Sequence, residues 1–171
     1  MAFINIEIKA RTNKADRIRQ YLLNHDADVQ GIDEQTDTYF NVPNGRLKLR
    51  QGNIENNLIY YQRQETGGTK QSNVDLFKVE DGDALRDMLT KALGVKAVVQ
   101  KKREIYYIGN VKFHLDTLEE LGSFVEIEAA NRFEDIPVEK LKQQCEAYMK
   151  EFGVEDGDLI RQSYSDMVLN T

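Results

Sequence analysis

Residues 111–128 read VKFHLDTLEELGSFVEIE, and both ends of this segment alternate between apolar and polar side chains. Lys112, His114 and Asp116 share one parity in the first stretch, and Glu126 and Glu128 share one in the second. Because successive side chains of a β-strand point to opposite faces, this period of two predicts two strands, each with an apolar face and a charged face.

The same alternation recurs along the chain. Glu7 and Lys9 share a parity in residues 3–10, and the run 46–50 alternates basic residues with leucines. Asn44-Gly45 and Gly109-Asn110 are typical of tight turns between paired strands, because these residues tolerate positive φ. The strands that we expect cover residues 3–10, 35–42, 46–50, 58–65, 73–79, 98–108, 111–117 and 123–129.

Helical periodicity predicts about four helices among these strands. Asp81 is a suitable N-cap and Gly94 a suitable end for a helix with the apolar stripe Leu85, Met88, Leu89 and Leu93. Another helix begins near Asn13 and Asp16, a third lies between Pro137 and Gly153, and a short one lies within residues 159–169. The stretch 66–69 predicts a glycine-rich loop.

Neighbouring strands joined by turns favour an antiparallel sheet. Eight such strands can close into a barrel, and helices with apolar stripes would then coat its outer face. We therefore expect an α+β fold of one domain over residues 1–171, a closed eight-stranded antiparallel β-barrel with the helices outside. Its charged strand faces would line a tunnel. The alternative is an ordinary half-buried sheet whose charged faces meet solvent.

Composition excludes several functions. Lys plus Arg number 23 and Asp plus Glu 29, so the net charge of −6 disfavours general nucleic-acid binding. The charge also argues against a polyphosphate ligand, unless the basic residues collect in one place. The single cysteine, Cys145, precludes an intrachain disulfide, and we expect it in the core. We find neither a membrane-length apolar run nor a signal peptide, and we expect a cytoplasmic protein that does not bind membranes.

A tunnel with bases on one wall and acids on another suits one kind of ligand. Arginine and lysine bind phosphate oxygens, and carboxylates hold Mg²⁺ or Mn²⁺, which bridge to the same phosphates. The chain has no glycine-rich phosphate loop. A polyphosphate would therefore be bound by side chains.

The sequence resembles the CYTH family of triphosphate tunnel enzymes, and most closely its class IV adenylate cyclases. The resemblance rests on six motifs and the tail, which follow one another along nearly the whole chain. They are Asn5-Ile6-Glu7-Ile8-Lys9, Asp37-Thr38-Tyr39-Phe40, Gly45–Arg50, Lys101–Tyr106, Phe113–Asp116, Leu121–Glu128 and Ser163–Met167.

The resemblance implies roles for ten residues. The divalent metal, Mg²⁺ or Mn²⁺, would be held by Glu7, Glu126 and Glu128, with Asp116 assisting. The triphosphate would contact Lys9, Lys48, Arg50, Arg63, Lys101 and Arg103. Two positions depart from the family pattern, because Asn5 replaces a glutamate and Arg63 a lysine. The resemblance assigns no catalytic base, and it implies that a homodimer is possible.

Three functions follow from this interpretation. The first is an adenylate cyclase that converts ATP to cyclic AMP and pyrophosphate. The alternative enzyme is a phosphohydrolase of thiamine triphosphate, inorganic triphosphate or a nucleotide. The third is a non-catalytic module that binds a nucleotide or polyphosphate, which Asn5 keeps open. We expect His114 to be a polar wall residue, with a catalytic base as the alternative. We expect Lys70 to lie on a mobile solvated loop, with contact to a ligand as the alternative. Tyr164 is a candidate to close one tunnel mouth.

Overall fold

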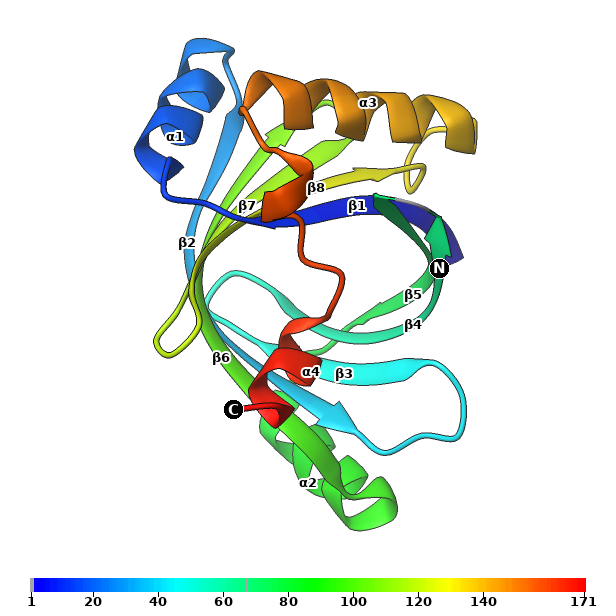
Figure 1. Ribbon diagram of the computed structural model, residues 1–171. Coiled ribbons are helices and arrows are strands. Elements are labelled where there is room, and N and C mark those ends of the chain that lie inside the picture. The colour runs from blue at the N-terminus through cyan, green and yellow to red at the C-terminus, as the bar shows by residue number, and fades with distance from the viewer. Residues whose placement is uncertain (1, 67) are drawn as a thin grey trace.

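The protein forms a closed β-barrel in the computed structural model, which describes residues 2–66 and 68–171 (Figure 1). The barrel order is β1-β5-β4-β3-β2-β6-β7-β8, and each neighbouring pair is antiparallel. This confirms the predicted fold class. The strands are β1 (Ala2–Arg11), β2 (Asp28–Phe40), β3 (Arg46–Gln51), β4 (Asn56–Thr66), β5 (Thr69–Lys78), β6 (Val95–Ile108), β7 (Val111–Leu118) and β8 (Gly122–Ala130).

Two strands begin four or more residues before the alternation predicts. The strand expected at 35–42 is β2, which begins at Asp28 because its first half pairs with β6. The strand expected at 73–79 is β5, which begins at Thr69 and pairs through Lys70 and Ser72. These added segments are mostly polar, so hydropathy alone does not show them. The loop expected over 66–69 includes Gly67, which lies outside the described residues.

In the described part of the chain, four α-helices lie outside the barrel: α1 (Ala15–Asn24), α2 (Gly82–Leu93), α3 (Val138–Glu151) and α4 (Tyr164–Leu169). The helix expected within 159–169 begins only at Tyr164. Ser163 caps it by accepting a hydrogen bond from the Asp166 backbone N–H. The preceding Leu159 and Ile160 instead bond to β1, where the Ile160 N–H donates to the Lys9 carbonyl.

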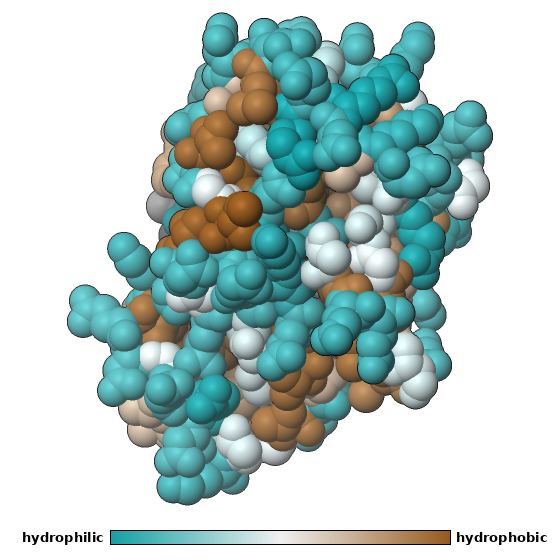
Figure 2. All heavy atoms as spheres, turned by 90° about the vertical axis from the view of Figure 1, so that its left-hand side faces the viewer, coloured by the Kyte–Doolittle hydropathy of each residue, from teal (hydrophilic) through white to brown (hydrophobic). Residues whose placement is uncertain are grey.

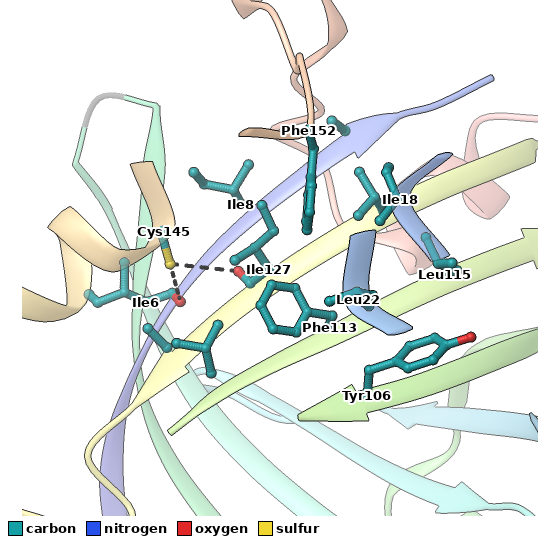
Figure 3. Close-up of a cluster of buried hydrophobic side chains, with 14 of the residues drawn as sticks. Ile6, Ile8, Ile18, Leu22, Tyr106, Phe113, Leu115, Ile127, Cys145 and Phe152 are labelled. Carbon is teal, nitrogen blue, oxygen red and sulfur yellow. Dashed lines mark hydrogen bonds between the residues drawn. The ribbon is translucent and has the colours of Figure 1, made fainter. Parts of the chain in front are cut away.

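The main hydrophobic core lies between the outer faces of β1, β7 and β8 and the helices α1 and α3 (Figure 3). Ile6, Phe113, Ile127 and Leu141 are completely excluded from solvent there. Cys145 also belongs to this core, and its thiol donates to the Ile6 carbonyl at 3.2 Å. Because the apolar strand faces are used outside, the charged faces must point inward.

Helix α2 departs from the expected packing. Its N-cap Asp81 and its end at Gly94 are as predicted, but no residue of the helix is fully buried. Leu85 and Leu89 pack on the small cluster around Phe40, whereas Met88 is 66% exposed. On the side that Figure 2 shows, apolar side chains form separate patches among hydrophilic ones. The apolar stripe of α2 is thus only partly buried, because the helix contacts mainly β2 and β3.

We predict that Leu141→Ala lowers the free energy of unfolding by about 2–5 kcal/mol, because it leaves a cavity between α3 and the barrel. Met88→Ala on exposed α2 is the matched control and should change stability by less than about 0.5 kcal/mol. Urea denaturation followed by circular dichroism measures both. Equal losses in the two variants would contradict the division between core and surface.

Candidate functional site

The inner faces of the strands line a cavity of about 440 Å³. Every strand that was expected to carry charges contributes to it, so the inward orientation predicted from parity is confirmed and the solvent-facing alternative is wrong. Charged lining residues are Glu7 and Lys9 on β1, Lys48 and Arg50 on β3, Arg63 on β4, Lys101 and Arg103 on β6, Lys112 on β7, and Glu126 and Glu128 on β8.

The character of the lining changes from one end of the cavity to the other. Along β1 the inward residues are Phe3, Asn5, Glu7 and Lys9 in that order. The Arg132 guanidinium, at the end of β8, lies over the Phe3 ring, and the neighbouring Phe133 is 82% exposed while lining the cavity. This end of the tunnel therefore meets solvent and is aromatic. Further in, Glu7 lies level with Glu128 and with the bases Lys70 and Lys112, and Lys9 lies deeper along β1.

The C-terminal segment covers the opposite end, where it crosses the barrel opening in Figure 1. The Tyr164 hydroxyl donates to Asp116 Oδ2 at 2.7 Å, and the Lys9 Nζ lies 3.9 Å from the centre of the Tyr164 ring. Arg46 holds the segment by donating to the Ser163 hydroxyl and to Asp166 Oδ2. Tyr164 thus closes one mouth, as the sequence predicts.

Asp37 organises the basic wall. Its carboxylate accepts two hydrogen bonds from Arg50, at 2.9 and 2.8 Å, and one from Lys101 at 2.7 Å, and the Lys48 Nζ lies 3.7 Å away. These cations hold the pKa of Asp37 well below its usual range, against the effect of burial. Burial, reinforced by Arg50 and Arg103, lowers the pKa of Lys101 to about 7 although Asp37 opposes the shift.

Arg103 makes the second charge cluster. Its guanidinium donates two hydrogen bonds to Asp116, at 2.7 and 2.8 Å, and one to Glu126 Oε1 at 2.8 Å. Asp116 faces Arg103 across the β6–β7 pair but does not line the cavity, and both of its oxygens are engaged by Arg103 and Tyr164. Glu7 also faces inward, where Arg63 donates to its Oε1 at 2.8 Å.

A third cluster contains no cation. His114, Glu126 and Glu128 place one potential ligand atom each within 4.8 Å of one another. Burial, with Glu126 and Glu7 nearby, raises the pKa of Glu128 to about 7. A divalent cation would relieve this crowding of negative charge, and carboxylate oxygens are ligands for Mg²⁺ and Mn²⁺. The residues present therefore fit a divalent metal.

Sequence reasoning missed several inward residues. Lys70 was expected on a solvated loop, which is wrong: it lies on β5 opposite Glu7 and is 4% exposed. Its Nζ has no hydrogen-bond partner among the described residues, and burial together with Lys9 lowers its pKa to about 8. The glycines before it suggest a loop, and only the pairing of β5 with β1 shows its place.

Glu55, between β3 and β4, was also missed. It reaches into the tunnel because the buried Asp33 carboxylate accepts backbone N–H bonds from Asn53, Ile54 and Glu55 and so fixes their loop. Lys112 donates to Glu55 Oε2 at 2.5 Å. Lys112 and Arg50 lower the pKa of Glu55 to about 2, although burial opposes them.

The chain belongs to the CYTH family, whose domain model matches residues 4–164. Similar solved structures cover both chains almost completely. The PH1012 protein of Pyrococcus horikoshii is 26% identical with a TM-score of 0.82, over 95% of this chain and 98% of that one. A protein of Vibrio parahaemolyticus, named as a candidate adenylate cyclase, is 18% identical with a TM-score of 0.77, over 98% of each chain.

A further similar structure is named for both a cyclase and a triphosphatase activity. It is an adenylyl cyclase candidate from Hippeastrum with a dominant triphosphatase activity, 15% identical over 89% of this chain and 88% of that one, with a TM-score of 0.62. At this identity the likeness establishes the fold alone. A search of curated proteins finds no match. Among the described residues no helix is long and apolar enough to cross a membrane.

We predict that Glu55→Gln destabilises the protein at neutral pH, on the order of 2–3 kcal/mol, and that the loss fades in acid. The folded pKa of Glu55 lies below its ordinary value of 4.5. Its ionised form therefore contributes stability that is present above pH 4.5 and disappears as the pH falls towards 2. Urea unfolding of both proteins from pH 7 to pH 2.5 measures the difference, and a gap independent of pH would contradict it.

Proposed function

We propose that the protein is a metal-dependent enzyme that acts on a triphosphate in its tunnel, and that its reaction converts ATP to cyclic AMP and pyrophosphate. The observation that carries this proposal is the order of side chains along the tunnel. Aromatic residues stand at the open end, and Glu7 and Glu128 follow together with Lys70 and Lys112. Lys9 and Lys101 lie beside Tyr164 at the closed end.

This order matches a nucleoside triphosphate bound with its phosphates inward. The nucleobase would stack near Phe3 and Phe133, which line the open end. The α-phosphate would then lie at the level of the carboxylates, and the β- and γ-phosphates would reach Lys9, Lys48 and Lys101. Arg50, Arg63 and Arg103 would add bidentate contacts. The positive wall would hold the pyrophosphate product while the α-phosphate reacts.

The reaction forms a bond between the ribose 3′-oxygen and the α-phosphorus. The bond from that phosphorus to the α–β bridging oxygen breaks, pyrophosphate carries away its electron pair, and the 3′-hydroxyl loses its proton. The lysine and arginine side chains named above supply positioning and charge neutralisation. Glu126 and Glu128, with Glu7 facing them from β1, would hold the divalent cation, whose chemistry is to neutralise phosphate charge. We assign no residue as the base.

Hydrolysis of a triphosphate is the second candidate. The observation that favours it is the closed basic end, since a terminal phosphate enclosed by Lys9, Lys101 and Tyr164 could meet water there without any contact at the aromatic mouth. A non-catalytic binding module is the third. Asn5 supports it, because an amide stands where the family pattern has a carboxylate.

We expect purified protein with Mn²⁺ or Mg²⁺ and ATP to yield cyclic AMP and pyrophosphate in equal amounts. Chromatography separates these products, and parallel reactions contain thiamine triphosphate or inorganic triphosphate. Orthophosphate without cyclic AMP would replace the cyclase with the hydrolase. Tight binding without turnover, in the native protein and in Asn5→Glu, would leave only the binding module.

We predict that Glu126→Gln reduces turnover roughly 100-fold, because it removes the charge of a buried carboxylate from the proposed metal site. Glu120→Gln, on the exposed turn between β7 and β8, is the matched control and should keep full activity. Unfolding curves establish that both variants are folded. An active Glu126→Gln enzyme would remove Glu126 from the site.

A further inference from the structure

His114 is a buried histidine without a hydrogen-bond partner. It lies in the middle of β7, directly opposite Glu126 on β8, and is 1% exposed. Neither ring nitrogen has a hydrogen-bond partner among the described residues. A buried polar group left unpaired is unfavourable, so an unpaired imidazole among buried charged side chains calls for a ligand.

The histidine is available to a metal because neither of its ring nitrogens is engaged by another described residue. The ring nitrogen that carries no proton offers a lone pair, which is what binds a metal.

Two carboxylates complete the cluster. The Nδ1 of His114 lies 3.8 Å from Glu128 Oε1, and one ligand atom each from His114, Glu126 and Glu128 lies within 4.8 Å of the others. Ligands that lie about 2.0–2.2 Å from one ion are at most about 4.4 Å apart, so small side-chain rotations are enough to bring the three together. Lys112 is engaged outside the cluster, where it bonds Glu55, whereas Arg103 bonds both Asp116 and Glu126 Oε1, so an ion bound here would share Glu126 with Arg103.

We propose that His114 is a nitrogen ligand in a divalent-metal site with Glu126 and Glu128, and that this nitrogen makes the site prefer a first-row transition ion such as Mn²⁺ over Mg²⁺. Imidazole is a good ligand for transition ions, whereas Mg²⁺ favours oxygen and keeps its waters. The inference extends the proposed function, because the same metal would serve the triphosphate reaction.

The test measures metal binding without any triphosphate. Electron paramagnetic resonance follows Mn²⁺ binding, and competition with Mg²⁺ gives the ratio of affinities. In the native protein, pulsed spectra of bound Mn²⁺ should show coupling to a nitrogen nucleus. In His114→Gln, whose side-chain oxygen can still bind a hard cation, the coupling should vanish, and the preference for Mn²⁺ should fall at least about tenfold.

The chain provides a matched control, because its other histidine lies far from the tunnel. His25 caps α1, is exposed, and stacks on Tyr21 at 3.9 Å. His25→Gln should keep both the coupling and the preference. If His114→Gln fails to fold, His25→Gln protein labelled with ¹⁵N-histidine tests the ligand without altering the site, because His114 is then the only histidine. The ¹⁴N coupling of bound Mn²⁺ must change to a ¹⁵N coupling.

Three outcomes overturn the inference: no saturable Mn²⁺ binding, bound Mn²⁺ without histidine coupling, or an unchanged affinity ratio in His114→Gln. Failure of the proposed function looks different. If histidine coupling is present but no triphosphate is turned over, the metal site stands and the enzyme assignment falls. If turnover occurs without the coupling, the enzyme assignment stands and the nitrogen ligand falls.

Discussion

The structure depends on the pairing of most of its buried charges with opposite charges. Closing the barrel removes the charged strand faces from bulk water, and the cost of desolvating an isolated ion is several kcal/mol or more. Asp37 pairs with Arg50 and Lys101, Asp116 with Arg103, and Glu55 with Lys112. These pairs stabilise the tunnel wall without a ligand. A triphosphate bound there would have to replace these internal partners with its own oxygens, so the acids of the wall would set its affinity together with the bases.

The outer surface of the barrel follows from the same division of faces. Apolar residues on β1, β7 and β8 have nowhere to pack except under α1 and α3, which gives the molecule one large core on that side. The other clusters among the described residues are smaller, and they lie around Phe124 beside α4, around Leu49 beside α2 and around Ile59. The large core therefore supports the strands that carry Glu126, Glu128 and His114. The proposed metal site thus lies on the strands that pack against the largest core.

Much of this was predictable from the sequence. The alternation along each strand assigns its side chains to one face or the other, and the helices need the apolar faces to pack against. Lys48, Arg50 and Glu126 could therefore be placed inside the barrel. Strand pairing could not be predicted from the same pattern, because the alternation within one strand does not give its register against the next strand. Asp37 was therefore missed as the partner of three bases, and Lys70 was mistaken for a loop residue. His114 was known to face the tunnel side, but its lack of a hydrogen-bond partner appears only when all of its neighbours are in place.

The C-terminal segment, held across one end of the barrel by Arg46 and Tyr164, makes the two ends of the tunnel unequal, with the aromatic residues at the other end. If ATP binds as proposed, with its phosphates towards the covered end, both products would leave past the aromatic residues. The cyclic nucleotide would then leave first, and pyrophosphate, surrounded by basic side chains, would leave last. Pyrophosphate would compete directly with incoming ATP and the cyclic nucleotide would not, so the order of exit would be visible in the pattern of product inhibition.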